Sequence, residues 1–211
     1  AFALGMGGQG GSPPGLLGFT VGEVNHGCSH GLRAYPTHAG WCELMRVAYV
    51  SGFADFVGGG EYSLFDLMTH LPADVKPVLL VPSAGTLSTA AERAGIEWHT
   101  APMSPIGMAS LPALWRWRQL IRDIRPDILH ANNSRAAFYA GMTGLRLGIP
   151  MIFHCRIVDR DRYLDWLLVR LATAIIANSR ATAERFSHWP DVHPNVIYNG
   201  IEMPDAPHRD R

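Results

Sequence analysis

Three consecutive glycines, Gly58, Gly59 and Gly60, precede Glu61, and together they have the residue types of an anion-binding turn. Glycine has no Cβ, so a ligand can approach the main chain closely. If the glycines begin a helix, free N–H groups and the positive end of the helix dipole would suit a phosphate. The alternatives are a tight turn that binds no ligand and a Glu61 that is only a capping carboxylate.

Two histidines, His130 and His154, each stand at the end of a short apolar run. A histidine at such a position can donate to a phosphate, a sugar hydroxyl or a backbone carbonyl. The alternative for each is a buried histidine that is bonded to a neighbouring carbonyl. Arg156 follows His154 closely and is well placed to bind an anion.

Asparagine, serine and arginine recur after two of the apolar runs, those that end at residues 131 and 177. They could bind a polar ligand, but asparagine and serine are also ordinary helix caps, and Ser134 and Ser179 have that simpler interpretation. The residues concerned are Asn132, Asn133, Ser134, Arg135, Asn178, Ser179 and Arg180.

These residues need a scaffold, and from residue 45 onward strand patterns alternate with helix patterns. Short continuous apolar runs, such as 78–81 and 174–177, are typical of strands buried on both faces. The predicted fold class is therefore α/β, a doubly wound, Rossmann-like parallel sheet that binds ligands at the carboxyl ends of its strands. Strands are predicted at 45–51, 77–82, 96–99, 127–131, 150–155, 173–177 and 195–198, and helices at 60–70, 86–94, 110–124, 134–147, 161–172 and 180–187.

The composition argues against several classes of protein. The 211 residues carry no formal net charge, so there is no electrostatic case for a nucleic-acid partner. Three cysteines do not make a disulfide framework, and a reducing, cytoplasmic location is expected. No apolar run approaches the roughly 20 residues that span a bilayer.

Residues 1–43 hold half of the glycines and show no periodicity, which predicts a poorly ordered tail before a domain at 44–203. Within the tail, 5–10 spells G-x-G-x-x-G, but no strand precedes it and no helix follows it, as a dinucleotide site would require.

Two groups have the residue types of metal ligands. His26, Cys28 and His30 lack a fourth ligand at a convincing spacing. Asp159 and Asp161 resemble a D-x-D site, but Asp161 has a sufficient role as a helix cap. No metal site is predicted.

The helix predicted at 110–124 has an aromatic and basic outer face. It could contact a membrane surface or a lipid-linked acceptor, which would place the protein peripherally at the inner face of the membrane. The alternative is a solvated face with one exposed tryptophan. The residues are Trp115, Arg116, Arg118 and Arg122.

Five motifs, in this order and at these spacings, give the chain a resemblance to the N-terminal domain of GT-B fold glycosyltransferases. The similarity is greatest to the large retaining group, the family 4-like transferases, and it covers about residues 45–203. The motifs are GGGE at 58–61, RPDILHAN at 125–132, GIP leading to HCR within 148–156, IANS at 176–179 and VIYNGI at 196–201.

The resemblance implies transfer of a sugar from a nucleotide-sugar donor to a glycan or lipid-linked acceptor, with retention and without a metal or other cofactor. It implies a catalytic role for His154 beside the transferred sugar, and binding of the donor diphosphate by Arg156 and the glycines. Basic side chains and helix ends can stabilise a leaving diphosphate without proton transfer. The implied acceptor side contains Glu61, Asn132, Asn133, Ser134, Arg135, Asn178, Ser179 and Arg180.

The resemblance covers half of such an enzyme. The second GT-B domain carries most nucleotide-sugar contacts, and 204–211 resembles the start of the linker that leads to it. We therefore expect this chain alone to have no appreciable transferase activity. The alternatives are a non-catalytic Rossmann-like module that binds a glycan or nucleotide, and a subunit of a split transferase.

Overall fold

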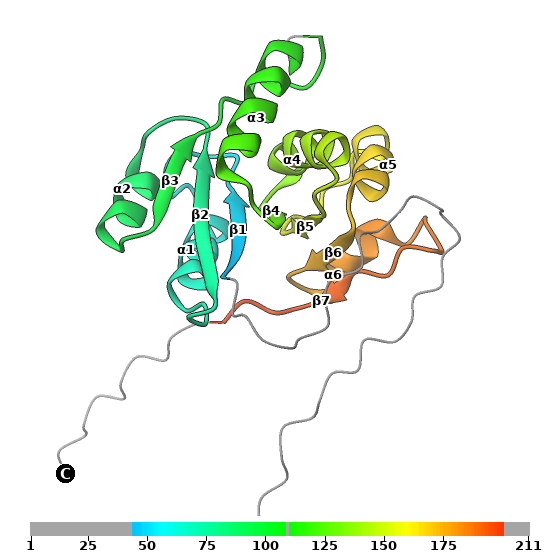
Figure 1. The fold of residues 1–211 in the computed structure, drawn as a ribbon. Coiled ribbons are helices and arrows are strands. Elements are labelled where there is room, and N and C mark those ends of the chain that lie inside the picture. Colours follow the sequence, from blue (N-terminus) through cyan, green and yellow to red (C-terminus); the bar gives the residue numbers. More distant parts are fainter. Residues whose placement is uncertain (1–43, 109, 201–211) are drawn as a thin grey trace, which may run out of the picture. The chain divides into compact units, whose positions relative to one another are not determined.

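The computed structural model describes residues 44–108 and 110–200, and Figure 1 shows how strands and helices alternate along them. Each strand and helix that the periodicity predicts is present. The strands are β1 (Met45–Val50), β2 (Val75–Val81), β3 (Glu97–Thr100), β4 (Ile128–Ala131), β5 (Met151–Cys155), β6 (Ala174–Ala177) and β7 (Asn195–Val196). The helices are α1 (Gly59–Thr69), α2 (Thr86–Arg93), α3 (Ser110–Ile124), α4 (Ser134–Leu147), α5 (Arg162–Leu171) and α6 (Arg180–Ala183), with a 3₁₀ turn, η1 (Glu184–Phe186), directly after α6.

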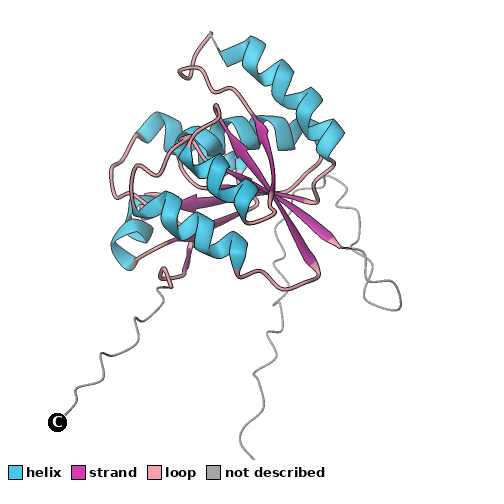
Figure 2. Cartoon of the chain, turned by 90° about the vertical axis from the view of Figure 1, so that its left-hand side faces the viewer, coloured by secondary structure: helices cyan, strands magenta, loops and turns pink. Residues whose placement is uncertain are grey.

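The strands form one parallel sheet in the order β3-β2-β1-β4-β5-β6-β7. Figure 2 shows the strands fanning out with the twist of the sheet, with helices around them. The doubly wound Rossmann-like sheet is thus confirmed. The chain extends the sheet in one direction from β1 to β3 and in the other from β4 onward. In such sheets a ligand site is expected beside the carboxyl ends of the strands where the order reverses, here β1 and β4.

Each face of the sheet has its own core. On one face, α3, α4 and α5 pack against the sheet around Trp117, Tyr139 and Phe153, which are fully buried. On the other face, Leu64 of α1 and Leu87 of α2 pack against β1 and β2. Both faces of these strands are covered, which is the physical reason for their nearly continuous apolar sequences.

The α1 face of the sheet carries two histidines. His130 lies in register with Tyr49, and His154 lies in register with Ile176. Side chains of neighbours in register point to the same face. The core cluster that α1 and α2 form with the sheet contains no residue of β5 or β6. Among the described residues, these two helices therefore leave β5 and β6 uncovered on this face, and a pocket can form there beside α1.

Two elements differ slightly from the prediction. The strand predicted to begin at Pro77 begins two residues earlier, at Val75. Proline lacks the N–H that a strand interior uses, so it resembles the first residue of a strand. Pro77 lies in register with β1, and β3 joins only from Val78 onward, so the ladder to β3 needs no N–H at Pro77. The helix predicted at 180–187 divides into α6 and η1.

Several predictions fall on residues that the structure does not describe: the tail at 1–43, the G-x-G-x-x-G pattern at 5–10, the linker at 204–211, and His26, Cys28 and His30.

Asp161 is described, and its Oδ1 accepts from the N–H groups of Tyr163 and Leu164 as the N-cap of α5. Within 44–108 and 110–200, no three His, Cys, Asp or Glu side chains are grouped to hold a metal ion. The same residues contain no helix with both the length and the apolar character needed to span a bilayer.

Candidate functional site

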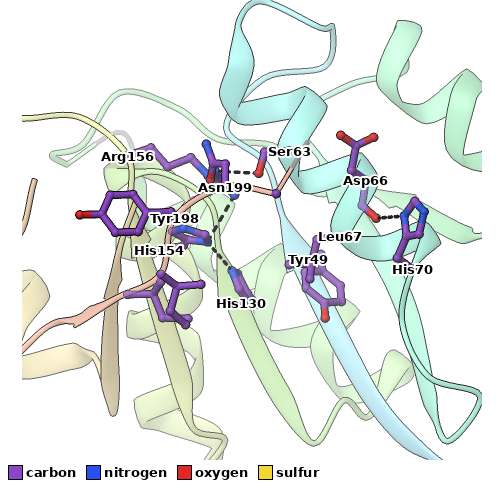
Figure 3. Close-up of a pocket in the computed structure, with 13 residues that line it drawn as sticks. Tyr49, Ser63, Asp66, Leu67, His70, His130, His154, Arg156, Tyr198 and Asn199 are labelled. Carbon is purple, nitrogen blue, oxygen red and sulfur yellow. Dashed lines mark hydrogen bonds between the residues drawn. The ribbon is translucent and has the colours of Figure 1, made fainter. Parts of the chain in front are cut away.

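A pocket of about 510 Å³ lies beside the carboxyl ends of β1, β4, β5 and β6 (Figure 3). Strand residues line it together with α1 and the segment that follows β7. Its size and its place at the reversal of strand order are those of a small-molecule site. The lining residues are Tyr49, Ser63, Asp66, Leu67, His70, His130, His154, Arg156, Ile176, Ile197, Tyr198, Asn199 and Gly200.

His154 is the penultimate residue of β5, and only 6% of its surface is exposed. Its Nδ1 lies 3.3 Å from Nε2 of His130 and 3.3 Å from Nη2 of Arg156. Its Nε2 is buried and has no hydrogen-bond partner among the described residues. Burial and the charge of Arg156 lower the pKa of His154 to about 3, so its imidazole is neutral near pH 7.

His130 lies on β4 beside His154 and is equally buried. The ring of Tyr49 packs against it, with 5.1 Å between ring centroids. The hydrogen-bond partner of His130 is the ring of His154 and not a backbone carbonyl, which was the alternative considered from the sequence. Burial lowers the pKa of His130 to about 4, with a contribution from the charge of Arg156.

Arg156 follows β5 and makes four side-chain hydrogen bonds, three to other segments and one to His154, two residues before it. Its Nε donates to Asn132 Oδ1 at 2.6 Å, and its Nη1 donates to Ser63 Oγ at 3.1 Å and Asn199 Oδ1 at 2.8 Å. Burial lowers the pKa of Arg156 to about 10, so the guanidinium stays charged near pH 7. A guanidinium has five N–H donors, so most of those of Arg156 already hold protein groups in place.

Asn132 joins Arg156 to the first turn of α1. It is buried after β4, and its Nδ2 donates to the carbonyl of Gly60 at 3.0 Å while its Oδ1 accepts from Arg156. A Cβ on Gly60 would lie 3.3 Å from Cδ of Arg156, which is a tight contact. The glycine at this position therefore lets the guanidinium pass close to the helix.

The other residues of the glycine turn have a different arrangement. The N–H of Gly58 donates to Oε2 of Glu61 at 3.1 Å, so the buried Glu61 caps α1. Cβ atoms on Gly58 and Gly59 would meet no atom within 4 Å. Within the described chain, packing does not require glycine at these two positions. The N–H of Glu61 donates to the carbonyl of Gly58 at 3.2 Å, whereas the N–H groups of Gly59 and Gly60 are among those that a helix leaves without an intrahelical acceptor.

The polar residues after β4 mostly serve the start of α4. Oδ1 of Asn133 accepts from the N–H of Ala136 at 2.9 Å as the N-cap. Oγ of Ser134 accepts from Nη2 of Arg185 at 3.3 Å. Arg135 is exposed, and its guanidinium lies 5.9 Å from the ring centroid of Phe53. None of Asn133, Ser134 and Arg135 lines the pocket, and the acceptor-binding role that the resemblance implies for them stays a prediction.

The residues after β6 contact the main chain of Arg156 or cap α6. Nδ2 of Asn178 donates to the carbonyl of Arg156 at 3.4 Å. Oγ of Ser179 accepts from the N–H of Thr182 at 3.1 Å, so Ser179 is the N-cap of α6. Arg180 is exposed. These three residues are also absent from the pocket lining.

Sequence reasoning missed one wall of the pocket. Ser63, Asp66, Leu67 and His70 have the i, i+3, i+4, i+7 spacing of a single helix face, so this signal was available in the sequence. Tyr49 lies within the strand predicted at 45–51 and has no comparable signal.

A buried ion pair was also missed. Nε of Arg185 donates to Oδ2 of Asp165 at 3.0 Å, and both side chains are buried. Nη1 of the same arginine donates to the carbonyl of Ile157 at 3.4 Å. Arg185 thus connects η1 to α5 and to the segment after β5. No local pattern marks such a pair, because its members come together only through the packing of α5 and η1 against the sheet.

The chemistry of the pocket is that of binding and charge stabilisation. Near pH 7 it offers a neutral imidazole, a guanidinium held by several segments, and an apolar wall from Leu67, Ile176 and Ile197. Oriented donors and a fixed positive charge stabilise negative charge without transferring a proton.

Several solved structures have a similar fold. HepE of Anabaena, in a crystal structure "in complex with UDP and glucose", is 20% identical in sequence, with a TM-score of 0.61, covering 75% of this chain and 45% of HepE. The lipopolysaccharide outer core galactosyltransferase WaaB is 16% identical, with a TM-score of 0.59, covering 79% of this chain and 50% of WaaB. MurG of Acinetobacter baumannii is 14% identical, with a TM-score of 0.55, covering 73% of this chain and 45% of MurG.

The chain thus spans half or less of the length of these three proteins. Comparison with curated protein sequences gives no significant match. A family profile does match: the profile of Glycosyltransferase Family 4 covers residues 57–203, which include most of the described sheet and all of the described pocket except Tyr49. The chain belongs to Glycosyltransferase Family 4, and its fold is that of the N-terminal domain of GT-B glycosyltransferases.

Proposed function

We propose that this chain is the acceptor-side domain of a retaining, metal-independent glycosyltransferase. It transfers a sugar from a nucleotide-sugar donor to a glycan or lipid-linked acceptor when the donor-binding domain completes the site. The family match supports glycosyl transfer, and the UDP and glucose found with HepE support a nucleotide-sugar donor.

The observation that carries the proposal is the buried Nε2 of His154, a residue of the pocket at the carboxyl edge of the sheet, which has no partner within residues 44–108 and 110–200. A buried polar atom without a partner is rare and calls for an external group. A sugar hydroxyl or phosphate oxygen can supply that group. His154 is therefore the residue proposed to contact the transferred sugar, and the charge of Arg156 helps to stabilise the leaving diphosphate.

The acceptor is proposed to bind along the same edge, close to the first turn of α1. Asn132 is buried and its amide already bonds Gly60 and Arg156, so we propose that it holds that turn in place beside Arg156. Glu61, Asn133, Ser134, Asn178 and Ser179 already have capping or packing partners, so we propose that they shape this edge. Arg135 and Arg180 are exposed and can meet an anionic acceptor.

A lipid-linked acceptor fits one further feature. The start of α3 and the loop before it expose Met108 (84%), Leu111 (58%) and Trp115 (63%), beside the exposed Arg116 and Arg122. Apolar side chains flanked by arginines suit the interface of an anionic membrane. We propose peripheral membrane contact through this apolar tip.

A binding experiment tests the proposed donor. UDP is titrated into the purified chain and followed by NMR shifts, with the His154→Ala and Arg156→Ala variants beside it. We expect weak binding that falls at least about tenfold in both variants, as expected for the loss of a charged or buried polar contact. Arg146→Ala, an exposed arginine on α4, is the control and should leave binding unchanged. Equal UDP shifts in all four proteins would contradict the proposal. UDP binding without any sugar transfer, even with a partner domain, would favour the non-catalytic binding module.

A further inference from the structure

The hydrogen bonds around His154 determine where its proton lies. Nη2 of Arg156 contacts Nδ1 of His154, and a guanidinium nitrogen can only donate. Nδ1 must therefore accept, and a neutral ring that accepts at Nδ1 carries its proton on Nε2.

His130 adds a second constraint on the same atom. Its Nε2 also contacts Nδ1 of His154, and because that atom is an acceptor, His130 must be the donor. His130 is itself held by the strand ladder of β4 and by the ring of Tyr49 at 5.1 Å. Two independent donors, on two neighbouring segments, thus converge on one nitrogen.

The other ring nitrogen of His154, Nε2, has no partner in the part of the chain that the structure describes. Nε2 is buried, belongs to a side chain with 6% exposure, and lies in a residue that lines the pocket. Figure 3 shows His154 between His130 and Arg156, with the hydrogen bonds to both drawn. His154 therefore holds a buried donor whose acceptor has to come from outside the described chain.

We propose that His130 is a positioning residue that, together with Arg156, holds His154 in the Nε2–H tautomer, so that His154 donates a hydrogen bond to an acceptor oxygen of the bound ligand. The tautomer is a property of the chain itself. The identity of the oxygen as part of a nucleotide sugar rests on the proposed function. A histidine in this state cannot accept a proton from the ligand at Nε2, so it binds and orients but does not act as a base.

The wild-type chain tests the tautomer without any substitution. Long-range ¹⁵N–¹H NMR distinguishes protonated from unprotonated ring nitrogens, and a His154→Asn sample assigns the resonances. We expect Nδ1 of His154 to have the shift of an unprotonated nitrogen and Nε2 that of a protonated one. A proton on Nδ1, or nitrogen shifts averaged between two tautomers, would overturn the proposal.

Two variants test His130 as the cause. His130→Phe keeps an aromatic ring but removes the donor, and His130→Gln keeps an N–H donor at a similar distance from the main chain. We expect the His154 nitrogen shifts to move toward a mixture of tautomers in His130→Phe and to return toward the wild-type values in His130→Gln. Unchanged nitrogen shifts in a folded His130→Phe protein would show that His130 plays no positioning role.

Addition of UDP to the labelled protein tests the positioning role of His130 and the proposed donor binding separately. On addition of UDP, we expect the Nε2–H resonance of His154 to shift while Nδ1 remains unprotonated. The expected tautomer with no UDP shift supports the positioning role and counts against donor binding at this pocket. A proton on Nδ1 together with a UDP shift overturns the positioning role and supports donor binding.

Discussion

Arg156 shows how a single side chain organises the site. It joins α1, the segment after β4, β5 and the segment after β7 through Ser63, Asn132, His154 and Asn199. The sequence predicted an arginine free to bind an anion. The structure shows that most of its donors are used to position other residues, so its charge and its remaining donor are what a ligand would meet.

Replacing Arg156 therefore has structural as well as binding consequences. Arg156→Ala removes several hydrogen bonds to a charged group, and we expect the free energy of unfolding to fall by about 2–4 kcal/mol. Arg156→Lys keeps the charge but loses the planar fork of donors, so its loss should be smaller. Urea denaturation measures both. Arg146→Ala on α4 is the matched control, expected within about 0.5 kcal/mol of wild type. An Arg156→Ala protein as stable as this control would show that the hydrogen-bond cluster contributes nothing to folding.

The two buried histidines predict a pH dependence of stability. Burial, with the charge of Arg156, lowers their pKa values from 6.5 to about 4 for His130 and about 3 for His154. The unfolded chain therefore binds their protons first as the pH falls below 6.5. Stability should decrease between pH 6.5 and about pH 4, by up to about 1.4 kcal/mol per pH unit for each histidine.

Denaturation curves at several pH values measure this slope. His130→Phe removes one of the two groups, so its stability should depend less steeply on pH in the same window. A wild-type stability that is constant from pH 6.5 to pH 4.5 would contradict the prediction. The charged group that faces both rings is Arg156, and Tyr49, whose pKa burial raises to about 12, stays neutral throughout.

At the scale of elements, the helix N-termini at the carboxyl edge are capped by the residues that the sequence marks as polar. Glu61 caps α1, Asn133 caps α4 and Ser179 caps α6. The capping role considered from the sequence is confirmed for Glu61 and Ser179 but is wrong for Ser134, because Asn133 is the cap of α4 and Ser134 is its first residue. The helix that borders the pocket is α1, and its first turn is the place where a ligand could meet free backbone N–H groups.

Two glycine substitutions separate packing from ligand binding at α1. Gly59→Ala meets no described atom and should change the free energy of unfolding by less than about 0.5 kcal/mol, because Gly59 is exposed and is the first residue of α1. If a phosphate approaches the backbone there, the same change weakens UDP binding. Gly60→Ala crowds Arg156 and should lower both stability and binding. Thermal unfolding and UDP titration measure the two effects, and unchanged UDP affinity in Gly59→Ala would remove that glycine from the donor site.

The apolar tip at the start of α3 predicts membrane binding. Met108→Ser combined with Trp115→Ser should abolish flotation of the chain with vesicles that contain anionic lipid, because exposed apolar side chains drive interfacial insertion. Leu145→Ser, an exposed leucine on α4, is the control. If the wild-type chain remains unbound to vesicles at low salt, the proposed membrane contact is wrong.

At the scale of the whole molecule, the chain corresponds to half or less of HepE, WaaB and MurG. The described pocket is bounded by α1, the sheet and the segment after β7, and contains few charged groups for a nucleotide diphosphate. We expect no appreciable sugar transfer by the purified chain when it is incubated with UDP-glucose and a lipid or glycan acceptor extract. Robust transfer, measured with radiolabelled donor, would contradict this expectation.

The order and type of the elements could be predicted from the sequence because they depend on local patterns. The apolar runs of β2, β4, β5 and β6 and the breakers Gly95, Gly148 and Pro126 act within a few residues of chain. Gly148 has φ of 70° at the end of α4, a conformation that glycine adopts without strain. The position of the polar residues at the carboxyl edge could be predicted for the same reason, because each of them directly follows a strand.

The sequence alone therefore determined a doubly wound sheet, the edge that carries its polar loops, and His154 with Arg156 as candidates. Only the tertiary structure decided which of those residues meet. His130 reaches His154 because β4 and β5 are neighbours in register, and Arg156 reaches Ser63 because α1 lies over the same edge. Strand order and register arise from packing between distant segments, and no local pattern encodes those distances.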